Sequence, residues 1–230
     1  MIRLAQFAVS PYCDKVRRIL RYKKLPFEIH EWPLAEVGSI RDKNPTGKLP
    51  FIEIDGTVIP DSTNIALEIE RRHPTPALIP SDPAQRALVL ALEDWADESL
   101  YFYEMTTRFG DADFDANVGK LMAGAPKEMI DAMSPMLREM FKQTTTTQGI
   151  GRKSADQLAG DLDRLFGAIE DLQRASGFVV GNSLTLADIA ICCQAECIGD
   201  STVGKQVLAK RPALAAYFKR VDELTKADRV

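Results

Sequence analysis

The chain begins with Met1-Ile2-Arg3-Leu4-Ala5-Gln6-Phe7-Ala8-Val9, which leads directly into Ser10-Pro11-Tyr12-Cys13. Residues 2–7 predict a short strand. Ser10-Pro11 predicts the start of a helix, because serine is a favoured N-cap and proline fits a helix's first turn. The apolar side chains that follow at helical spacing give this helix one packing face; they are Cys13, Val16, Ile19 and Leu20. The sequence therefore predicts a strand that delivers the chain directly to a helix N-terminus.

Basic residues occupy the rest of this first helix; they are Lys15, Arg17, Arg18 and Arg21. A run of like charges beside an apolar face is typical of a helix with one side in water. We therefore expect these four side chains to form a solvated basic face, which is also suited to an acidic partner.

The strand pattern continues outward from this turn. A second strand is predicted over residues 27–32 and a helix over residues 62–72. Between them, Asp55-Gly56 separates two short apolar runs at residues 51–54 and 57–59, which is a strong hairpin signal. One crossover helix and one hairpin in the same sheet require both parallel and antiparallel pairing. The first part of the chain is therefore predicted to hold a mixed sheet with helices.

The second half of the chain is almost entirely helical in pattern. Helices are predicted over residues 82–109, 127–143, 154–175, 185–198 and 211–226. The four threonines at 144–147 are expected to end the second of these, because β-branched residues weaken helices. Prolines are dense between residues 74 and 83 and cannot continue a helix. We therefore predict an α/β domain over residues 1–74, a linker over 75–83 and an all-helical domain over 84–230.

Composition and charge exclude several classes of protein. The chain has 230 residues, 45% of them hydrophobic, so it can bury a substantial core, and its net charge of -4 argues against broad nucleic-acid binding. The N-terminal residues lack the features of a signal peptide, and no run of apolar residues is long enough to span a membrane. We therefore expect a cytoplasmic protein with no membrane span.

The four cysteines are unlike a disulfide framework; they are Cys13, Cys192, Cys193 and Cys197. They do not form spaced pairs across the chain, which favours reduced thiols in a reducing compartment. The last three lie on one apolar helix at a spacing that fits no zinc template. We expect them to be buried core thiols and expect no metal site. Cys13 is expected to pack in the core.

Four segments, in this order, resemble motifs of the cytosolic glutathione S-transferase superfamily. Ser10-Pro11-Tyr12-Cys13 resembles its serine-type active-site turn, and Asn44-Pro45-Thr46-Gly47-Lys48-Leu49-Pro50 resembles the loop that ends in its cis-proline. Asp61-Ser62 resembles its acidic-serine pair, and residues 182–188 resemble the capping motif of its buried helix. Together the segments cover nearly the whole chain. The resemblance implies a thioredoxin-like N-terminal domain, with a mixed four-stranded sheet and helices, followed by an all-helical C-terminal domain.

The resemblance also implies a glutathione site and a homodimer. The residues that would hold glutathione are Lys48, Leu49, Pro50, Asp61 and Ser62. In this reading Asp61 receives the ammonium of the ligand, Ser62 its γ-glutamyl carboxylate and Lys48 its glycyl carboxylate. The backbone of Leu49 pairs with the tripeptide, before a cis Leu49–Pro50 bond. The superfamily more often has Glu or Gln where Asp61 stands.

Ser10 is the candidate catalytic residue. In serine-type members the matching hydroxyl stabilises the thiolate of glutathione. A free thiol has a pKa of about 8.5, and lowering it by roughly two units requires only about 2.7 kcal/mol. One hydroxyl hydrogen bond together with a helix N-terminus supplies an effect of that size.

Each of these residues also has a plain structural interpretation. Ser10 fits a helix N-cap, and Asp61-Ser62 fits another. The aromatic residues near the end of the helix over 82–109 fit core packing, with Tyr103 or Arg108 as candidates for the wall of an electrophile pocket. The resemblance favours the site interpretation for Ser10 and leaves the two readings of Asp61-Ser62 equally open.

Two functions are left open by the sequence. The first is conjugation of glutathione thiolate to a small electrophile. The alternative is a non-catalytic homodimer of the same fold that binds a protein partner; Gln148-Gly149-Ile150-Gly151-Arg152 resembles an outlying group of the superfamily, and bacterial members that bind the division GTPase FtsZ are of this kind. A glutathione-dependent reductase or isomerase is a weaker third reading, because its usual Cys or Ser-Ser-Cys motif is absent. The charged C-terminal tail is a candidate interaction segment.

Overall fold

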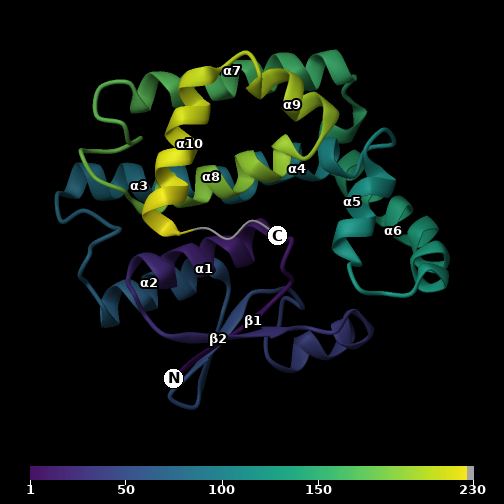
Figure 1. The fold of residues 1–230 in the computed structure, drawn as a ribbon, viewed down its shortest axis with the longest axis horizontal. Coiled ribbons are helices and arrows are strands. Elements are labelled where there is room, and N and C mark those ends of the chain that lie inside the picture. Colours follow the sequence, from purple (N-terminus) through teal and green to yellow (C-terminus); the bar gives the residue numbers. More distant parts are fainter. Residues whose placement is uncertain (227–230) are drawn as a thin grey trace.

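A computed structural model describes residues 1–226 (Figure 1). Its elements follow in the order β1 (Ile2–Gln6), α1 (Pro11–Tyr22), β2 (Phe27–Glu31), η1 (Leu34–Asp42), β3 (Phe51–Ile54), β4 (Thr57–Pro60), α2 (Ser62–Arg72), α3 (Pro83–Trp95), η2 (Ala96–Leu100), α4 (Tyr101–Arg108), α5 (Phe114–Leu121), α6 (Lys127–Gln148), η3 (Ile150–Arg152), α7 (Ala155–Gln173), α8 (Leu186–Gly199), α9 (Thr202–Leu208) and α10 (Pro212–Thr225). The tail over residues 227–230, a candidate interaction segment from the sequence, lies outside the described residues.

The strands form one four-stranded sheet in the order β2-β1-β3-β4. β1 pairs with β2 in parallel, whereas β1 with β3 and β3 with β4 are antiparallel. The predicted mixed sheet is therefore confirmed. The hairpin turn has positive φ at both central residues, 52° at Asp55 and 77° at Gly56, which suits the right-handed twist of the strands it joins. This sheet with α1 and α2 is the thioredoxin-like domain.

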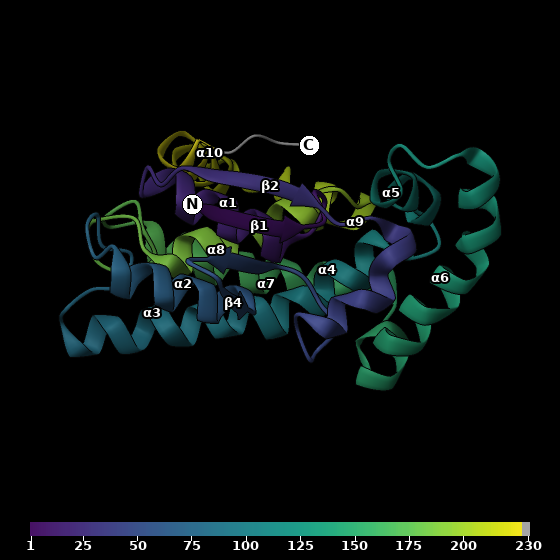
Figure 2. The same cartoon turned by 90° about the horizontal axis from the view of Figure 1, so that it is seen from below.

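The helical domain is built around α8, which lies between α10 and α3 in Figure 2. The predicted capping motif is present at its start: Thr185 and Asp188 form a capping box, and the Asp188 carboxylate also accepts bonds from the Val179 N–H and the Tyr217 hydroxyl. α8 packs against α1, α3 and α4, and most of its side chains are buried. It is therefore the element through which the two domains share one hydrophobic core.

The structure corrects the predicted end of the second helix. α6 continues through the threonines at 144–147 to Gln148 and ends at Gly149, where φ is 110°. The hydroxyls of Thr144 and Thr145 donate to carbonyls one turn earlier, and Thr145 is buried. Packing and these bonds outweigh the weak helix propensity of threonine, which amounts to only a few tenths of a kcal/mol per residue.

Other helices differ from the prediction in extent. The helix expected over residues 82–109 is broken by the π-helical turn η2 between α3 and α4. α5 and α9 were not predicted, because helices of eight and seven residues carry too few periodic positions to stand out in the sequence. α5 and α6 extend at one end of the molecule (Figure 2) and share a small hydrophobic core of their own around Phe114, Val118, Met122 and Leu137.

The predicted solvated basic face of α1 is wrong. Lys15, Arg17 and Arg18 are only 1%, 4% and 0% exposed. α1 packs against α8 and α10, and acidic residues of the helical domain pair with Lys15 and Arg18, whereas Arg17 pairs with Asp14 within α1. The sequence of α1 contains no sign of the partners in the helical domain, since they lie more than seventy residues away in the chain. Within the described residues, no helix is long and apolar enough to cross a membrane.

Candidate functional site

Ser10 stands at the junction predicted from the sequence. It is the N-cap of α1, with extended backbone, and its Oγ accepts a long bond of 3.4 Å from the Cys13 N–H. Among the described residues, the Ser10 hydroxyl accepts this one hydrogen bond and donates none. Its O–H is therefore available to donate a hydrogen bond to a ligand. An anion placed here also meets the positive end of the α1 dipole. The arrangement can stabilise a thiolate.

A cavity of about 510 Å³ opens beside Ser10. Ala8 and Val9 line it on one side and helices of the C-terminal domain on the other, which places it between the two domains. Its charged lining is balanced, with Arg17, Arg108 and Lys120 against Asp14, Glu196 and Asp200. Of the two pocket candidates, Arg108 lines the cavity, whereas the Tyr103 hydroxyl donates to Asp161. The cavity has room for a small molecule next to the Ser10 hydroxyl.

The other five predicted residues lie on two segments that contact each other, residues 44–50 and the start of α2. The Leu49–Pro50 peptide bond is cis, as expected, and the Pro50 carbonyl accepts a hydrogen bond of 3.2 Å from the Asp61 N–H. This bond joins the loop of residues 44–50 to the start of α2. Lys48 is exposed, Leu49 is half-buried and Ser62 is buried. The two predicted segments are therefore neighbours, although neither lines the cavity beside Ser10.

Asp61 is held in an unusual backbone conformation. Its φ of 75° and ψ of 131° lie outside the left-handed helical region that a non-glycine residue normally uses when φ is positive. Such a conformation costs about 1–3 kcal/mol and is concentrated at ligand clamps and active sites. One carboxylate oxygen, Oδ1, caps α2 by accepting from the N–H groups of Thr63 and Asn64, both at 3.0 Å. The structural cap reading is thus correct, and it engages only one of the two oxygens.

A buried charge cluster joins α1 to the helical domain close to α2. Lys15 in α1 donates to Glu93 at 2.7 Å and to Asp97, and the Thr63 hydroxyl also donates to Glu93. The Tyr12 hydroxyl donates to the backbone carbonyl of Asp97. One cation thus faces two carboxylates, and burial raises the pKa of the Asp97 carboxyl to about 6 although Lys15 opposes the shift.

The cysteines of α8 lie where the helix meets α1 and the cavity. Cys192 and Cys193 are buried, as predicted; Cys197 is half-buried and lines the cavity together with Cys193. Burial raises the pKa of each of these three thiols and raises the pKa of Cys13 to about 11, so all four thiols are protonated at neutral pH. None of them is therefore a ready nucleophile.

Among residues 1–226, one group of side chains has ligand atoms close enough to hold a metal: Cys192, Glu196 and Asp222. The guanidinium of Arg18 lies among them, donating to Glu196 at 2.7 Å and to Asp222 at 2.6 Å. The fully buried Arg18 is thus the cation that this group neutralises. The cluster fastens α1 to α8 and α10.

Two family models match the chain. Residues 4–77 match the glutathione S-transferase N-terminal domain and residues 125–224 match the glutathione S-transferase C-terminal domain. Together they span most of the sequence, and the first contains Ser10 and all five predicted glutathione-binding residues. Members of this family bind glutathione as a co-substrate.

Individual relatives agree with these models. A glutathione S-transferase of Pseudomonas putida is 26% identical over 211 residues, which is 91% of this chain and 79% of the relative. A probable maleylacetoacetate isomerase 1 of Drosophila melanogaster is 35% identical over 82 residues, a third of each chain.

Solved structures share the fold over nearly the full length. The beta-etherase LigF of Sphingobium sp. strain SYK-6 has a TM-score of 0.72 at 20% identity, covering 99% of each chain. A glutathione S-transferase of Rhodospirillum rubrum F11 has a TM-score of 0.68 at 23% identity, covering 96% of this chain and 88% of that one. With both domain models matched in order and the two-domain fold observed, the chain belongs to the glutathione S-transferase superfamily.

Proposed function

We propose that this protein is a glutathione transferase in which the Ser10 hydroxyl stabilises the glutathione thiolate for attack on a small electrophile. The observation that carries the proposal is the position of Ser10, whose uncommitted hydroxyl lies at a helix N-terminus beside the cavity between the domains. In the reaction, the thiolate forms a bond to an electrophilic carbon. The electron pair leaves with the displaced group, or on an acceptor atom that is then protonated. Ser10 lowers the barrier by holding the thiol in its ionised form.

The tripeptide is proposed to extend from Ser10 towards the start of α2. The second oxygen of Asp61 would receive the ligand's ammonium, and the N-terminus of α2 with Ser62 its carboxylate. Leu49 would pair with the backbone of the tripeptide, and exposed Lys48 would meet the glycyl carboxylate. The strained backbone of Asp61, held by its bond to Pro50, supports a ligand role for this turn.

Calorimetric titration with reduced glutathione tests this site. We expect one-site binding at millimolar glutathione, and Asp61→Asn should weaken it about tenfold, because the change keeps the helix cap and removes only the charge. Asp82→Asn is the matched control: Asp82 caps α3 in the same way, through a bond from the Gln85 N–H. If the folded wild-type protein fails to bind glutathione, the transferase proposal is wrong, and the result favours a non-catalytic protein that binds a protein partner.

The protein is also proposed to be a homodimer that associates through α2 and α3. Leu67 in α2 and Leu88 and Leu90 in α3 are 41%, 43% and 36% exposed. Both helices lie on the lower side of the molecule in Figure 2. Exposed leucines on neighbouring elements are typical of a surface that is buried on association.

Analytical ultracentrifugation distinguishes the monomer from the dimer. We expect the wild-type protein to sediment as a dimer at micromolar concentration and Leu88→Asp to shift it to monomer, because a charge buried in an apolar interface loses its hydration. Leu172→Asp, at a leucine of α7 with a similar exposed fraction of 41%, should remain dimeric. A monomeric wild-type protein, or an undisturbed Leu88→Asp dimer, would refute this interface.

A further inference from the structure

The loop that carries Ser10 is tied down by charged side chains from three elements. It spans residues 7–10, between the end of β1 and the start of α1, and all four residues are half-buried. Packing alone therefore does not fix its position. Its internal structure is one turn, in which the Ser10 N–H donates to the Phe7 carbonyl at 3.1 Å. Three more backbone groups of the loop, the Ala8 N–H and the Ala8 and Val9 carbonyls, are bound by side chains from outside the loop.

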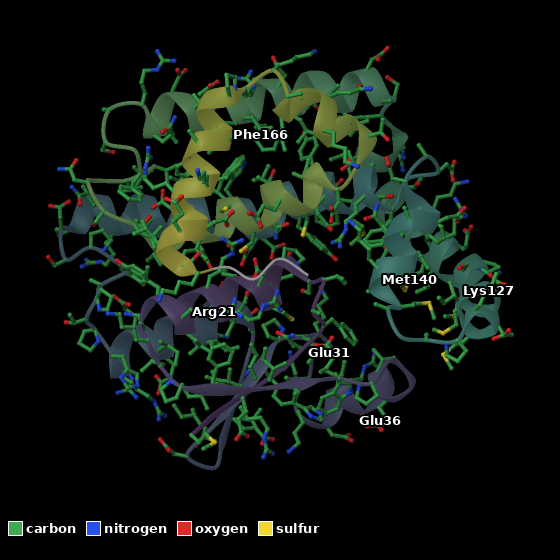
Figure 3. The ribbon with its side chains drawn as sticks, in the orientation of Figure 1. Arg21, Glu31, Glu36, Lys127, Met140 and Phe166 are labelled. Atoms are coloured by element: carbon green, nitrogen blue, oxygen red, sulfur yellow. The ribbon has the colours of Figure 1, made fainter. Side chains whose placement is uncertain are left out.

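Glu31 binds the loop from β2, where it is the last residue of the strand (Figure 3). Its Oε1 accepts from the Ala8 N–H at 2.7 Å, and its Oε2 accepts from Nε2 of Gln6 at 2.9 Å. Gln6 is the register partner of Glu31 across the β1–β2 pair. Both carboxylate oxygens are thus used to join β2 to the segment that leads into Ser10.

Two nearly buried guanidinium groups hold the carbonyls of the same loop. Arg17 in α1 donates to the Ala8 carbonyl at 3.0 Å and to Oε1 of Gln6 at 2.7 Å. Arg108 in α4 donates to the Val9 carbonyl at 3.1 Å. Ala8 is therefore bound on its N–H by an anion and on its carbonyl by a cation.

The backbone groups of this loop do not require charged partners for their hydrogen bonds. A half-buried loop can satisfy its N–H and carbonyl groups with water. This chain instead uses Arg17 and Arg108, each under 5% exposed, and burying a charged group is costly unless its bonds are well placed. Rigid placement within about 0.5 Å is what a catalytic hydroxyl requires.

We propose that Glu31 is a positioning residue that, together with Arg17 and Arg108, fixes the Ala8–Val9 backbone so that the group at position 10 points into the cavity at the α1 N-terminus. The proposal deepens the transferase function and rests on it for its catalytic meaning. The geometry itself can be measured without glutathione.

The test replaces the hydroxyl by a reporter thiol. In Ser10→Cys, the rate of alkylation by iodoacetamide, followed residue by residue with mass spectrometry across pH, gives the pKa of the thiol at position 10. The wild-type protein is the blank, because burial keeps its own cysteines protonated at neutral pH. We expect Glu31→Ala, made on the Ser10→Cys background, to raise this pKa by about one unit and to slow alkylation about tenfold at neutral pH, since a misplaced thiolate loses the helix terminus.

The direction in which the thiol pKa changes distinguishes a positioning role of Glu31 from a purely electrostatic effect of its charge. Removing a negative charge without moving the loop lowers a neighbouring thiol's pKa. Glu31→Gln keeps an oxygen for the Ala8 N–H, so we expect it to leave the pKa unchanged or lower it. Glu36→Ala removes an equal charge from η1, at a residue that lies apart from the loop (Figure 3), and should not raise it. If Glu31→Ala lowers the pKa or leaves it unchanged, the positioning role is refuted.

The transferase function is tested separately from this role. If the wild-type protein binds no glutathione but Glu31→Ala still raises the pKa of the thiol at position 10, the transferase function is refuted and the positioning role of Glu31 is retained. If glutathione is conjugated, Glu31→Ala with Ser10 intact should lower kcat about tenfold with little change in KM, and Glu31→Gln should restore it. A fully active Glu31→Ala enzyme would refute the positioning role of Glu31 and leave the transferase function intact.

Discussion

Ser10→Ala should lower kcat/KM for conjugation of glutathione with chlorodinitrobenzene by about 10- to 100-fold. The hydroxyl has a free proton and lies at the N-terminus of α1. A hydrogen bond to a charged group contributes about 1.5–3 kcal/mol, and each 1.36 kcal/mol corresponds to a factor of ten. The pKa of bound glutathione should rise accordingly, which can be followed through the ultraviolet absorbance of the thiolate.

Folding must be separated from chemistry in this variant. Ser10 also caps α1, although its bond from the Cys13 N–H is long, and loss of a cap costs about 1 kcal/mol of stability. Ser10→Thr keeps both the hydroxyl and the cap and should retain activity. Thermal unfolding of all three proteins controls for the cap. Conjugation by Ser10→Ala within a factor of three of wild type would rule out Ser10 as the group that stabilises the thiolate.

Lys15→Met should strongly destabilise the packing of the two domains, lowering the free energy of unfolding by about 3–5 kcal/mol at pH 7. Removing the cation leaves Glu93 and Asp97 as uncompensated carboxylates, and breaking a buried ion pair from one side has a cost of this size. Lys15 is 1% exposed and its partners' side chains are 3% and 10% exposed, so water cannot replace it.

The loss of unfolding free energy in Lys15→Met should depend on pH. Without Lys15, the pKa of the Asp97 carboxyl in the folded protein rises further above its unfolded value of about 4, so the folded state binds more protons than the unfolded state between those values. Stability relative to wild type is therefore lost as pH rises and recovered as pH falls towards 5. Urea unfolding at pH 5 and pH 7 measures this difference.

Two controls identify the cause. Lys15→Met combined with Glu93→Gln and Asp97→Asn removes all three charges and should recover most of the loss, since an uncharged cluster leaves no carboxylate unpaired. Lys219→Met removes an exposed lysine that lies 3.8 Å from Glu223 and should change stability by less than about 0.5 kcal/mol. A Lys15→Met protein as stable as Lys219→Met would show that this cluster does not hold the domains together.

Local signals in the chain were enough to predict most elements of the fold. The Ser10-Pro11 start of α1, the Asp55-Gly56 turn, the Thr185–Asp188 cap of α8 and the mixed sheet all depend on neighbouring residues, and all are present in the structure. The cis Leu49–Pro50 bond required the resemblance, because the residues around a proline do not by themselves indicate its isomer. The end of α6 was predicted wrongly from a propensity that packing outweighed.

The candidate site also combines features that local sequence predicts with features that depend on tertiary packing. The sequence by itself determined the candidate residues for a glutathione site, and it placed Ser10 and Asp61 at helix N-termini, because capping is a local interaction. Only the tertiary structure decided which charged groups surround them. Glu31 and Arg108 reach the loop before Ser10 from 23 and 99 residues away, and Lys15 meets its carboxylates 78 and 82 residues along the chain. A charge pair across such distances depends on the packing of α1 against α8, and no pattern within α1 distinguishes a buried arginine from a solvated one.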